Sequence, residues 1–285
     1  MLAVKIDDTV GSRPRIGLDR AAVVDVEPVE GGLTRVLAVF SSAAPGGIPG
    51  GVGPIRSARE SDVTLLANWG HVALAYSGGS ARTRSVVDGA DLAAIPYDAS
   101  TKGYRRAGDR KAPYNVIGDT RALLARAGTG ATSGDPGFRF GPAGPGGGAG
   151  SSVSTAWPAT RMTLTWAAAR RYLIDTDGRP DIDAGGPQQG AATVIGQQVP
   201  VHLSENRVVK GVPTPVVDVA GHGAVTVLRD GYTWRGEWSR PSLTAPTSFS
   251  ADGRPIAMAD GPVWVLLVPR RSGRRRRLSG ADRSR

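Results

Sequence analysis

Two stretches in the first forty residues carry the hydrophobic pattern of paired strands. Residues 22–27 alternate, with three aliphatic side chains on one face and Asp25 and Glu27 on the other. A second apolar run, residues 33–40, follows a short loop that contains two glycines. The pattern predicts a β-hairpin whose returning strand carries Arg35. Local charge compensation would account for these three charged residues without any ligand.

The segment Gly53-Pro54-Ile55-Arg56-Ser57-Ala58-Arg59 is predicted to open a helix that runs to about Asn68. At about 100° per residue, Arg56 and Arg59 share one helix face with three apolar residues, Val63, Leu66 and Ala67. The apolar part of this face should pack inward, which draws both guanidinium groups towards the interior at the first turn. Because a helix N-terminus already carries positive partial charge, the two arginines need anionic partners, from the protein or from a ligand.

The next elements are predicted to be a strand at 71–76, a glycine-rich turn at 77–80, and helices at 81–87 and 120–126. A strand, a glycine-rich turn and a helix in this order can cradle an anion. The turn has no phosphate-binding lysine signature, so an ordinary connection between a strand and a helix is the favoured interpretation.

The second half is rich in strand patterns, and a strong turn signal pairs two of them. Asp230-Gly231 separates two apolar runs and predicts a two-residue hairpin. Residues 263–268 are expected to be a buried closing strand that could complete a sheet shared with the first half. Three tryptophans fit core and cross-strand packing better than a ligand platform, namely Trp234, Trp238 and Trp264. Further strands are predicted at 162–166, 171–175, 192–203, 216–219 and 224–228.

These patterns predict an α+β chain in two halves. The first half, residues 1–128, mixes helices with a sheet and holds the candidate polar site. The second half, residues 159–269, is predicted to be mostly antiparallel β. Between them, residues 129–158 are rich in glycine and proline and are expected to form a linker, much of it flexible, with Phe138 and Phe140 as its few apolar anchors.

Charge and cysteine content narrow the classes of function. The net charge is +10, but residues 270–285 hold eight arginines and one aspartate, so the rest of the chain carries only about +3. This basic tail is predicted to be disordered, and specific nucleic-acid binding is not indicated. The chain has no cysteine, which excludes disulfides, thiolate metal sites, thiol nucleophiles and a lipid on an N-terminal cysteine. No apolar run reaches the roughly 18 residues of a membrane span, and the first residues carry no signal-peptide pattern.

Eight short motifs follow one another along the chain: Val4–Asp8, Arg13-Pro14, Gly17-Leu18, Glu30–Arg35, Gly53–Arg59, Arg110–Asn115, Gly231–Trp238 and Gly261–Pro269. In this order they resemble the YerB-like family of bacterial proteins, often lipoproteins, of unassigned function. The resemblance spans about residues 3–269 and implies a two-part fold outside the cytoplasmic membrane, with membrane association, but no activity. Where this chain has Tyr114 the family commonly has a histidine, and the pKa of tyrosine near 10 weakens acid–base catalysis at that position.

The remaining candidate chemistry is a polar group in the first half. The sequence lacks a serine-nucleophile elbow, a phosphate-binding loop, a complete dinucleotide fingerprint and a zinc-protease helix, and it predicts no metal and no cofactor. Arginine forks bind carboxylate or phosphate in a bidentate manner. We therefore assign ligand binding to Glu30, Arg35, Arg56, Arg59, Arg110, Lys111 and Asn115.

Three hypotheses stay open for this group. The first is a binding module for an anionic small molecule or envelope polymer, held by Arg35, Arg56 and Arg59. The second is a hydrolase or transferase on a phosphate- or sugar-containing polymer, with Glu30 or Asp25 as general base. The third is an internal network of arginines and carboxylates that fixes the fold, with function at a protein–protein surface. The sequence favours binding over catalysis and leaves the oligomeric state open.

Geometry separates these three hypotheses. Arginines that line an open cleft with an unpaired head group would favour the binding module. A carboxylate that faces the arginines across a water-sized gap would favour an enzyme. Arginines paired one-to-one with carboxylates and sealed from solvent would favour the internal network.

Overall fold

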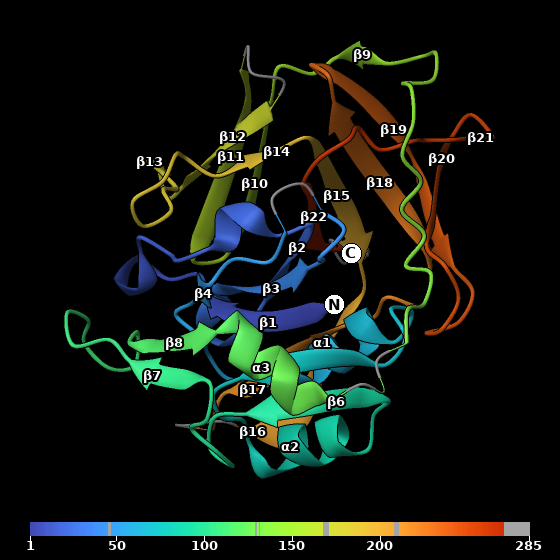
Figure 1. Ribbon diagram of the computed structural model, residues 1–285. Helices are drawn as coiled ribbons and strands as arrows, with labels where there is room; N and C mark the ends of the chain where they lie inside the picture. Colours follow the sequence, from blue (N-terminus) through green and yellow to red (C-terminus); the bar gives the residue numbers. More distant parts are fainter. Residues whose placement is uncertain (45–46, 129, 131, 168–170, 208–210, 271–285) are drawn as a thin grey trace, which may run out of the picture.

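The computed structural model describes residues 1–44, 47–128, 130, 132–167, 171–207 and 211–270 (Figure 1). A mixed sheet of twelve strands runs through both halves of the chain, in the order β21-β20-β19-β18-β15-β22-β2-β3-β1-β5-β6, with β9 paired to β19. The first half supplies β1 (Leu2–Asp7), β2 (Val23–Pro28), β3 (Thr34–Phe40), β5 (Val72–Tyr76) and β6 (Leu92–Pro96). The segment between the halves supplies β9 (Gly148–Ala149). The second half supplies β15 (Thr193–Val199), β18 (Gly221–Arg229), β19 (Tyr232–Arg240), β20 (Ser248–Ala251), β21 (Arg254–Pro255) and β22 (Val263–Pro269).

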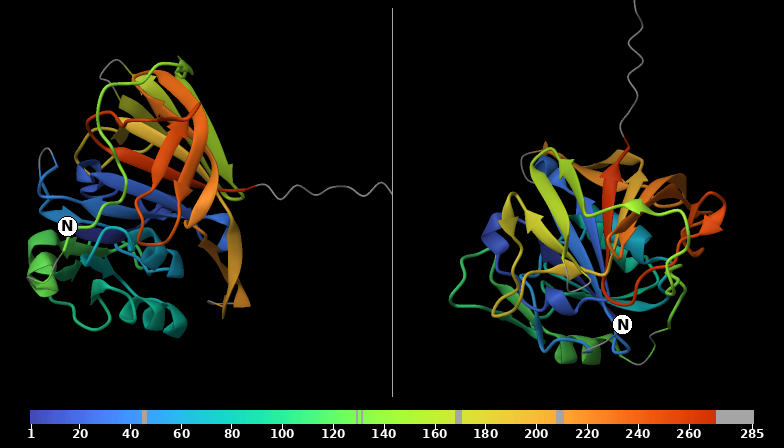
Figure 2. Two further views of the ribbon diagram at one scale, coloured as in Figure 1. Left: turned by 90° about the vertical axis from the view of Figure 1, so that its right-hand side faces the viewer. Right: turned by 90° about the horizontal axis from the view of Figure 1, so that it is seen from above.

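Smaller elements surround this sheet. Figure 2 shows the small sheet of β10 to β12 and the β18–β19 hairpin towards one end of the molecule, and α2 and α3 towards the other. The helices are α1 (Glu60–Leu66), α2 (Ala81–Asp88) and α3 (Thr120–Ala127), and three short 3-10 turns are η1 (Val10–Ser12), η2 (Leu18–Arg20) and η3 (Glu30–Gly32). The remaining strands are β4 (Gly51–Val52), β7 (Tyr104–Arg106), β8 (Val116–Asp119), β10 (Ser152–Trp157), β11 (Thr160–Ala167), β12 (Arg171–Thr176), β13 (Arg179–Pro180), β14 (Gly190–Ala191), β16 (Val201–Arg207) and β17 (Pro213–Val217).

Both faces of the central sheet are covered by protein. On one face Val4, Val24 and Leu266 belong to a core shared with α3 and the small sheet of β10 to β12. On the other face Leu37 and Val265 pack with residues of α1, β17 and β20. The predicted hairpin of β2 and β3 is confirmed. Its acidic residues, Asp25 and Glu27, are buried because protein covers both faces of these central strands.

The closing strand joins the two halves. β22 pairs in parallel with β2 on one side, at Val23↔Val263, and with β15 on the other, at Thr193↔Val263. This confirms the predicted shared sheet, and the fold is α+β as predicted. The β15, β18, β19, β20 and β21 series is antiparallel, as predicted for the second half, while β22 is the exception. The division of the chain into independent domains at residues 129–158 stays a prediction.

In the second half, the predicted Asp-Gly turn and the predicted burial of three tryptophans are confirmed, and one predicted strand is interrupted. The Asp-Gly turn at Asp230 has the positive backbone φ of 52° that the predicted hairpin requires, and the three tryptophans are buried. The strand predicted at 192–203 is interrupted, because β15 ends at Val199 and β16 begins at Val201. Pro200, which cannot donate to a sheet ladder, lies at the break, and β16 pairs with β17 away from the main sheet.

The segment that joins the halves makes more contacts than the predicted linker with a minor anchor. It runs along the side of the molecule towards β9 (Figure 1). The Phe138 ring lies between Trp69 and Phe249, with centroid distances of 6.0 and 6.2 Å. The amide of Asn68 donates to the Pro136 carbonyl at 3.3 Å. By contrast, the second predicted anchor, Phe140, is exposed. The predicted disorder of the basic tail lies outside the described residues, apart from Arg270.

Candidate functional site

The arginine segment is an extended insert between two parallel strands. β1 and β5 pair from Leu2↔Ala73 to Val4↔Ala75, and beyond that point residues 54–58 lie between them. The Arg56 amide donates to the Lys5 carbonyl at 2.9 Å, and the Arg56 carbonyl accepts from the Ser77 amide at 2.8 Å. The predicted helix over 54–68 is therefore wrong at its start, since α1 begins only at Glu60.

Two of the predicted arginines are paired with carboxylates. Arg56 Nε donates to Asp7 Oδ2 at 2.8 Å, and its guanidinium lies 5.8 Å from the centroid of the Tyr114 ring. Arg59, the residue before α1, contacts Glu30 Oε2 through Nη2 at 2.5 Å and Nε at 3.1 Å. The Arg59 side chain is only 8% exposed and that of Arg56 21%, so these pairs are partly sealed from solvent.

Arg35 differs from its two neighbours. Its Nη1 donates to the Ser57 carbonyl at 3.1 Å, and Arg59 Nη1 donates to the same oxygen at 3.4 Å. None of the ion pairs among the described residues includes Arg35. Burial, with the charges of Arg59 and Arg56, lowers the pKa of Arg35 to about 10, against opposing effects of Asp7 and Glu30. Of the three guanidinium groups in this cluster, Arg35 is the one without a carboxylate at ion-pair distance among the described residues.

The carboxylates of this cluster are held ionised. Burial alone would raise the pKa of Asp7, but hydrogen bonds from Thr9 and Arg56 lower it below its usual range. Burial opposes ionisation of Glu30 as well, but Arg59 and the Thr214 hydroxyl lower the pKa of Glu30. A carboxylate with a lowered pKa is a weak general base at neutral pH. Glu30 is also in direct contact with Arg59, with no water-sized gap between them.

The other predicted residues lie beyond Tyr114. Asn115 Oδ1 accepts from Arg106 Nη1 at 2.8 Å, and the Arg106 guanidinium lies 5.3 Å from the centroid of the Tyr97 ring. Arg110 donates to the backbone carbonyls of Ser12 and Pro14, at 3.1 and 2.5 Å. Arg110 therefore anchors the loop after η1, and Lys111 is exposed. The structure unites Glu30, Arg35, Arg56 and Arg59, places Asn115 in a neighbouring group, and gives Arg110 a backbone-anchoring position.

Beneath the arginine cluster lies a buried network that sequence reasoning missed. Lys5 is fully buried, and its Nζ contacts Glu27 Oε1 and, at 2.7 Å, Asp62 Oδ1. Asp62 Oδ2 also accepts from the Arg59 amide at 2.7 Å, which ties the network to the cluster above. Burial raises the pKa of Glu27, although Lys5 opposes this effect. The available signal was a lysine inside an apolar strand, because a buried ammonium requires carboxylate partners.

A second buried network connects the two halves. Arg15 contacts Asp8 Oδ1 through Nη1 and Asp181 Oδ2 through Nη2, and all three residues are buried. Asp8 also accepts from the Thr34 hydroxyl. No local sequence pattern predicts the ion pair between Arg15 and Asp181, since the two residues are distant in sequence. This network has the form of an internal ion-pair network that fixes the fold, because both terminal nitrogens of the Arg15 guanidinium have a carboxylate partner.

Comparison with known proteins identifies the fold and its relatives. Two family models, described as the N-terminal and C-terminal domains of a protein of unknown function (DUF3048), match residues 1–133 and 153–265. The chain belongs to the YerB-like family. It is 32% identical over 116 residues to a Bacillus subtilis (strain 168) protein described as "Putative lipoprotein YerB". That match covers 40% of this chain and 33% of the relative, about a third of its length.

A solved structure is similar in fold over nearly the whole chain. The crystal structure of the YerB protein from Bacillus subtilis superposes with a TM-score of 0.78 and covers 94% of this chain and 90% of that one. Sequence identity in this superposition is 21%, so the likeness concerns the fold alone. Among the described residues, no helix is long and apolar enough to span a membrane. The names of the matching families and of the matched proteins state no activity.

Proposed function

We propose that the protein is a binding module for an anionic group, phosphate or carboxylate, which is bound at Arg35 between Arg56 and Arg59. The observation that carries the proposal is that Arg35, unlike Arg56 and Arg59, forms no ion pair within the described part of the chain. Its guanidinium donates to one backbone carbonyl and has no carboxylate partner among the described residues. Because guanidinium forks bind phosphate and carboxylate in a bidentate manner, an anion at this point would pair with the Arg35 guanidinium and relieve repulsion among the three arginines.

The position of the cluster in the sheet supports the proposal. β1, β5 and β6 are parallel, and ligands of α/β sheets commonly bind beyond the carboxyl ends of parallel strands, where neighbouring strands separate. Asp7 ends β1, and Ser77 follows β5 at this edge. Ser57 and Arg56 come from the segment that fills the gap between the two strands, so the cluster lies at the carboxyl ends of these parallel strands.

The proposed ligand is a component of the cell envelope. This part of the proposal rests on the YerB-like resemblance, since the matched relative is described as "Putative lipoprotein YerB". Phosphate-containing wall polymers and carboxylate-containing wall fragments both present groups that the Arg35 guanidinium would bind. We propose binding without catalysis, because Glu30 is held ionised in direct contact with Arg59.

One observation favours a second candidate function, in which the arginines are internal struts. Arg56 and Arg59 each have a carboxylate partner, and the Arg59–Glu30 pair is also tied to β17 by the Thr214 hydroxyl, at 2.6 Å from Glu30 Oε1. In this alternative the pairs hold the β16–β17 hairpin against the first half, and partner proteins bind elsewhere. The two candidates differ at Arg35. Its substitution removes no ion pair among the described residues, but it would remove the proposed anion site.

The first test is thermal unfolding of the wild type and of Arg35→Gln, with inorganic phosphate or glycerol 3-phosphate added at constant ionic strength. A ligand that binds only the folded state adds about 2.7 kcal/mol of stability at a hundredfold excess over its dissociation constant. We expect a saturable rise of the wild-type midpoint and a loss of this response in Arg35→Gln. The variant itself should fold as well as the wild type, because it removes a buried guanidinium that is repelled by Arg59 and Arg56 and has no ion pair within the described chain.

Arg235→Gln is the matched control, since Arg235 is an exposed arginine on β19 in the other half. It changes the net charge by the same amount and should keep the full response to phosphate. If neither anion shifts the wild-type midpoint, or if both variants lose the response equally, the anion site does not exist and the strut alternative stands.

A further inference from the structure

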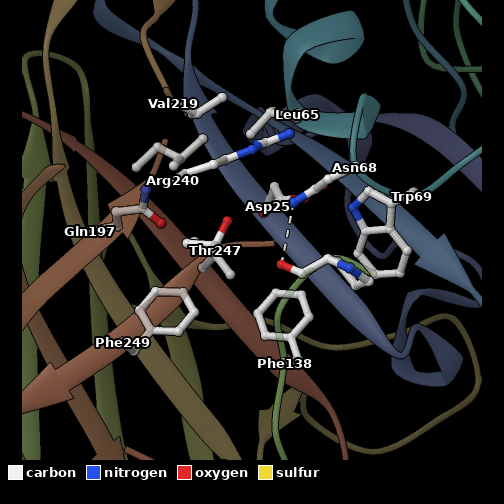
Figure 3. A pocket seen from close by; sticks show the side chains of 13 residues that line it. Asp25, Leu65, Asn68, Trp69, Phe138, Gln197, Val219, Arg240, Thr247 and Phe249 are labelled. Atoms are coloured by element: carbon white, nitrogen blue, oxygen red, sulfur yellow. Dashed lines mark hydrogen bonds between the residues drawn. The ribbon is translucent and has the colours of Figure 1, made fainter. Parts of the chain in front are cut away.

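A small polar cavity lies under the sheet on the side of α1, away from the arginine cluster. Three parts of the chain meet there: β2 with the end of α1 from the first half, the joining segment at Pro136 and Phe138, and β15, β19 and β20 from the second half. Figure 3 shows the side chains of Asp25, Gln197, Arg240 and Thr247 gathered around it, with the rings of Phe138 and Phe249 below. Polar groups from separate elements thus face one small, partly open space.

These polar groups have unmet hydrogen-bonding capacity. The side chain of Asp25 has no hydrogen bond or ion pair to another side chain or backbone group within the described part of the chain, although the residue is only 6% exposed. Arg240 Nη2 donates to the carbonyls of Thr64 and Leu243, while Arg240 Nε is buried without a partner among the described residues. Buried polar groups cost free energy unless they are hydrogen-bonded. A polar guest in the cavity would supply the missing bonds.

The volume of the cavity limits the size of the molecule that it can hold. The space open to the centres of water-sized molecules is about 30 Å³, and a single water molecule needs about 10 to 15 Å³ of such space. About two water molecules therefore fit, and an organic ligand does not. We propose that this cavity is a hydration site in which about two water molecules join the carboxylate of Asp25 to the guanidinium of Arg240.

Water fits the chemistry of the lining better than an ion does. Asp25 accepts hydrogen bonds, Arg240 Nε only donates, and the Thr247 hydroxyl and the Gln197 amide can do both. A metal cation would be repelled by Arg240, and an anion by Asp25. A neutral molecule that both donates and accepts satisfies the whole set, and a buried water makes about three such bonds on average.

The burial of Asp25 in this cavity, two residues before Glu27 on the same strand, also favours the protonated form of its carboxyl group. Burial and the charge of Glu27 raise the pKa of Asp25 to about 7, while Lys5 and Arg240 oppose this effect and Asp62 adds to it. In the unfolded chain an aspartate titrates near 4. The folded state therefore retains a proton between pH 4 and pH 7 that the unfolded state has lost, so the contribution of Asp25 to stability falls as the pH rises through this window.

High-resolution crystallography of the full chain tests the hydration site directly. We expect ordered water within hydrogen-bond distance of Asp25 and of Arg240 Nε, in a cavity bounded by Phe138 and Phe249. Direct contact between Asp25 and Arg240, collapse of the cavity around apolar side chains, or a bound organic molecule or ion would each overturn the proposal.

The proton-binding part is tested by melting temperature against pH. Asp25→Asn keeps the shape and removes the titration, so between pH 5 and pH 8 the wild-type midpoint should fall by about 3 to 6 °C more than that of Asp25→Asn. Asp109→Asn, at an exposed aspartate, should follow the wild type. Parallel curves for the wild type and Asp25→Asn would overturn this part. The crystallographic test uses the wild type, so it can still be performed if Asp25→Asn does not fold.

Discussion

At the scale of single residues, the cluster around Arg35 combines paired and unpaired charge. Arg56 and Arg59 are fixed by Asp7 and Glu30, and these fixed pairs hold a third guanidinium that lacks a carboxylate partner within the described chain. The anion site that we propose would be preorganised, because two of its arginines are already held in place before any ligand arrives. The unpaired residue, rather than the paired ones, should therefore control binding.

Lys5 is predicted to be essential for stability. Lys5→Met leaves Glu27 and Asp62 buried without their cation, and removal of one partner of a buried ion pair costs about 3 to 5 kcal/mol. Urea unfolding should show this loss in the free energy of unfolding. Lys102→Met, at an exposed lysine, should change that free energy by about 0.5 kcal/mol or less. Equal stability of the two variants would contradict the buried network.

The residues of the site were only partly predictable from the sequence. Glu30, Arg35, Arg56 and Arg59 belong to short motifs that stand out, and the structure brings these four together. Lys5 and Asp62 were missed because their pairing depends on contacts between β1, β2 and α1 that are far apart in the chain. Arg110 was grouped with the site by its charge, but its partners are backbone carbonyls, which no sequence pattern indicates.

At the scale of elements, locally encoded structure was predicted well and non-local structure was not. The hairpin of β2 and β3 and the turn at Asp230 depend on nearby residues, and both are confirmed. The segment 54–58 was assigned to a helix from its periodicity. In the structure the backbone of this segment is hydrogen-bonded to β1 and to the end of β5, and such pairing with distant strands overrides local propensity.

Gly137 is predicted to control docking of the joining segment. Its φ is +98°, and a Cβ atom built there would lie 1.9 Å from the backbone oxygen of Thr247, so Gly137→Ala should displace the segment from β20. Gly144→Ala is the matched control, because a Cβ at Gly144 meets nothing within 4 Å. Limited proteolysis should cut Gly137→Ala much faster between residues 132 and 150 than Gly144→Ala. Equal rates would contradict the docking.

At the scale of the whole molecule, the two halves are joined by long-range contacts. β22 lies between β2 and β15, and Arg15 reaches Asp181 across the boundary. Two family models divide the chain near the joining segment, yet the sheet is continuous across that division. We therefore expect that neither side of this sequence boundary folds alone, and a fragment tests this.

A fragment of residues 1–150 is predicted not to fold cooperatively. Without β22 the edge of β2 is unpaired, and without Asp181 the buried guanidinium of Arg15 loses one of its carboxylates. The amide NMR spectrum of the fragment should be poorly dispersed, and its thermal unfolding should lack a sharp transition. The chain of residues 1–270 is the control and should melt cooperatively. A well-dispersed spectrum for the fragment would show that the first half is an independent domain.

The most direct test of the central claim is a phosphate titration followed by NMR of the arginine side chains. The ¹⁵Nε resonance of Arg35, assigned by its absence from Arg35→Gln, should shift in a saturable manner as phosphate is added at constant ionic strength. The resonances of exposed arginines such as Arg235 should stay in place. If the Arg35 resonance does not move, or if all arginine resonances drift together without saturation, the protein has no anion site at Arg35.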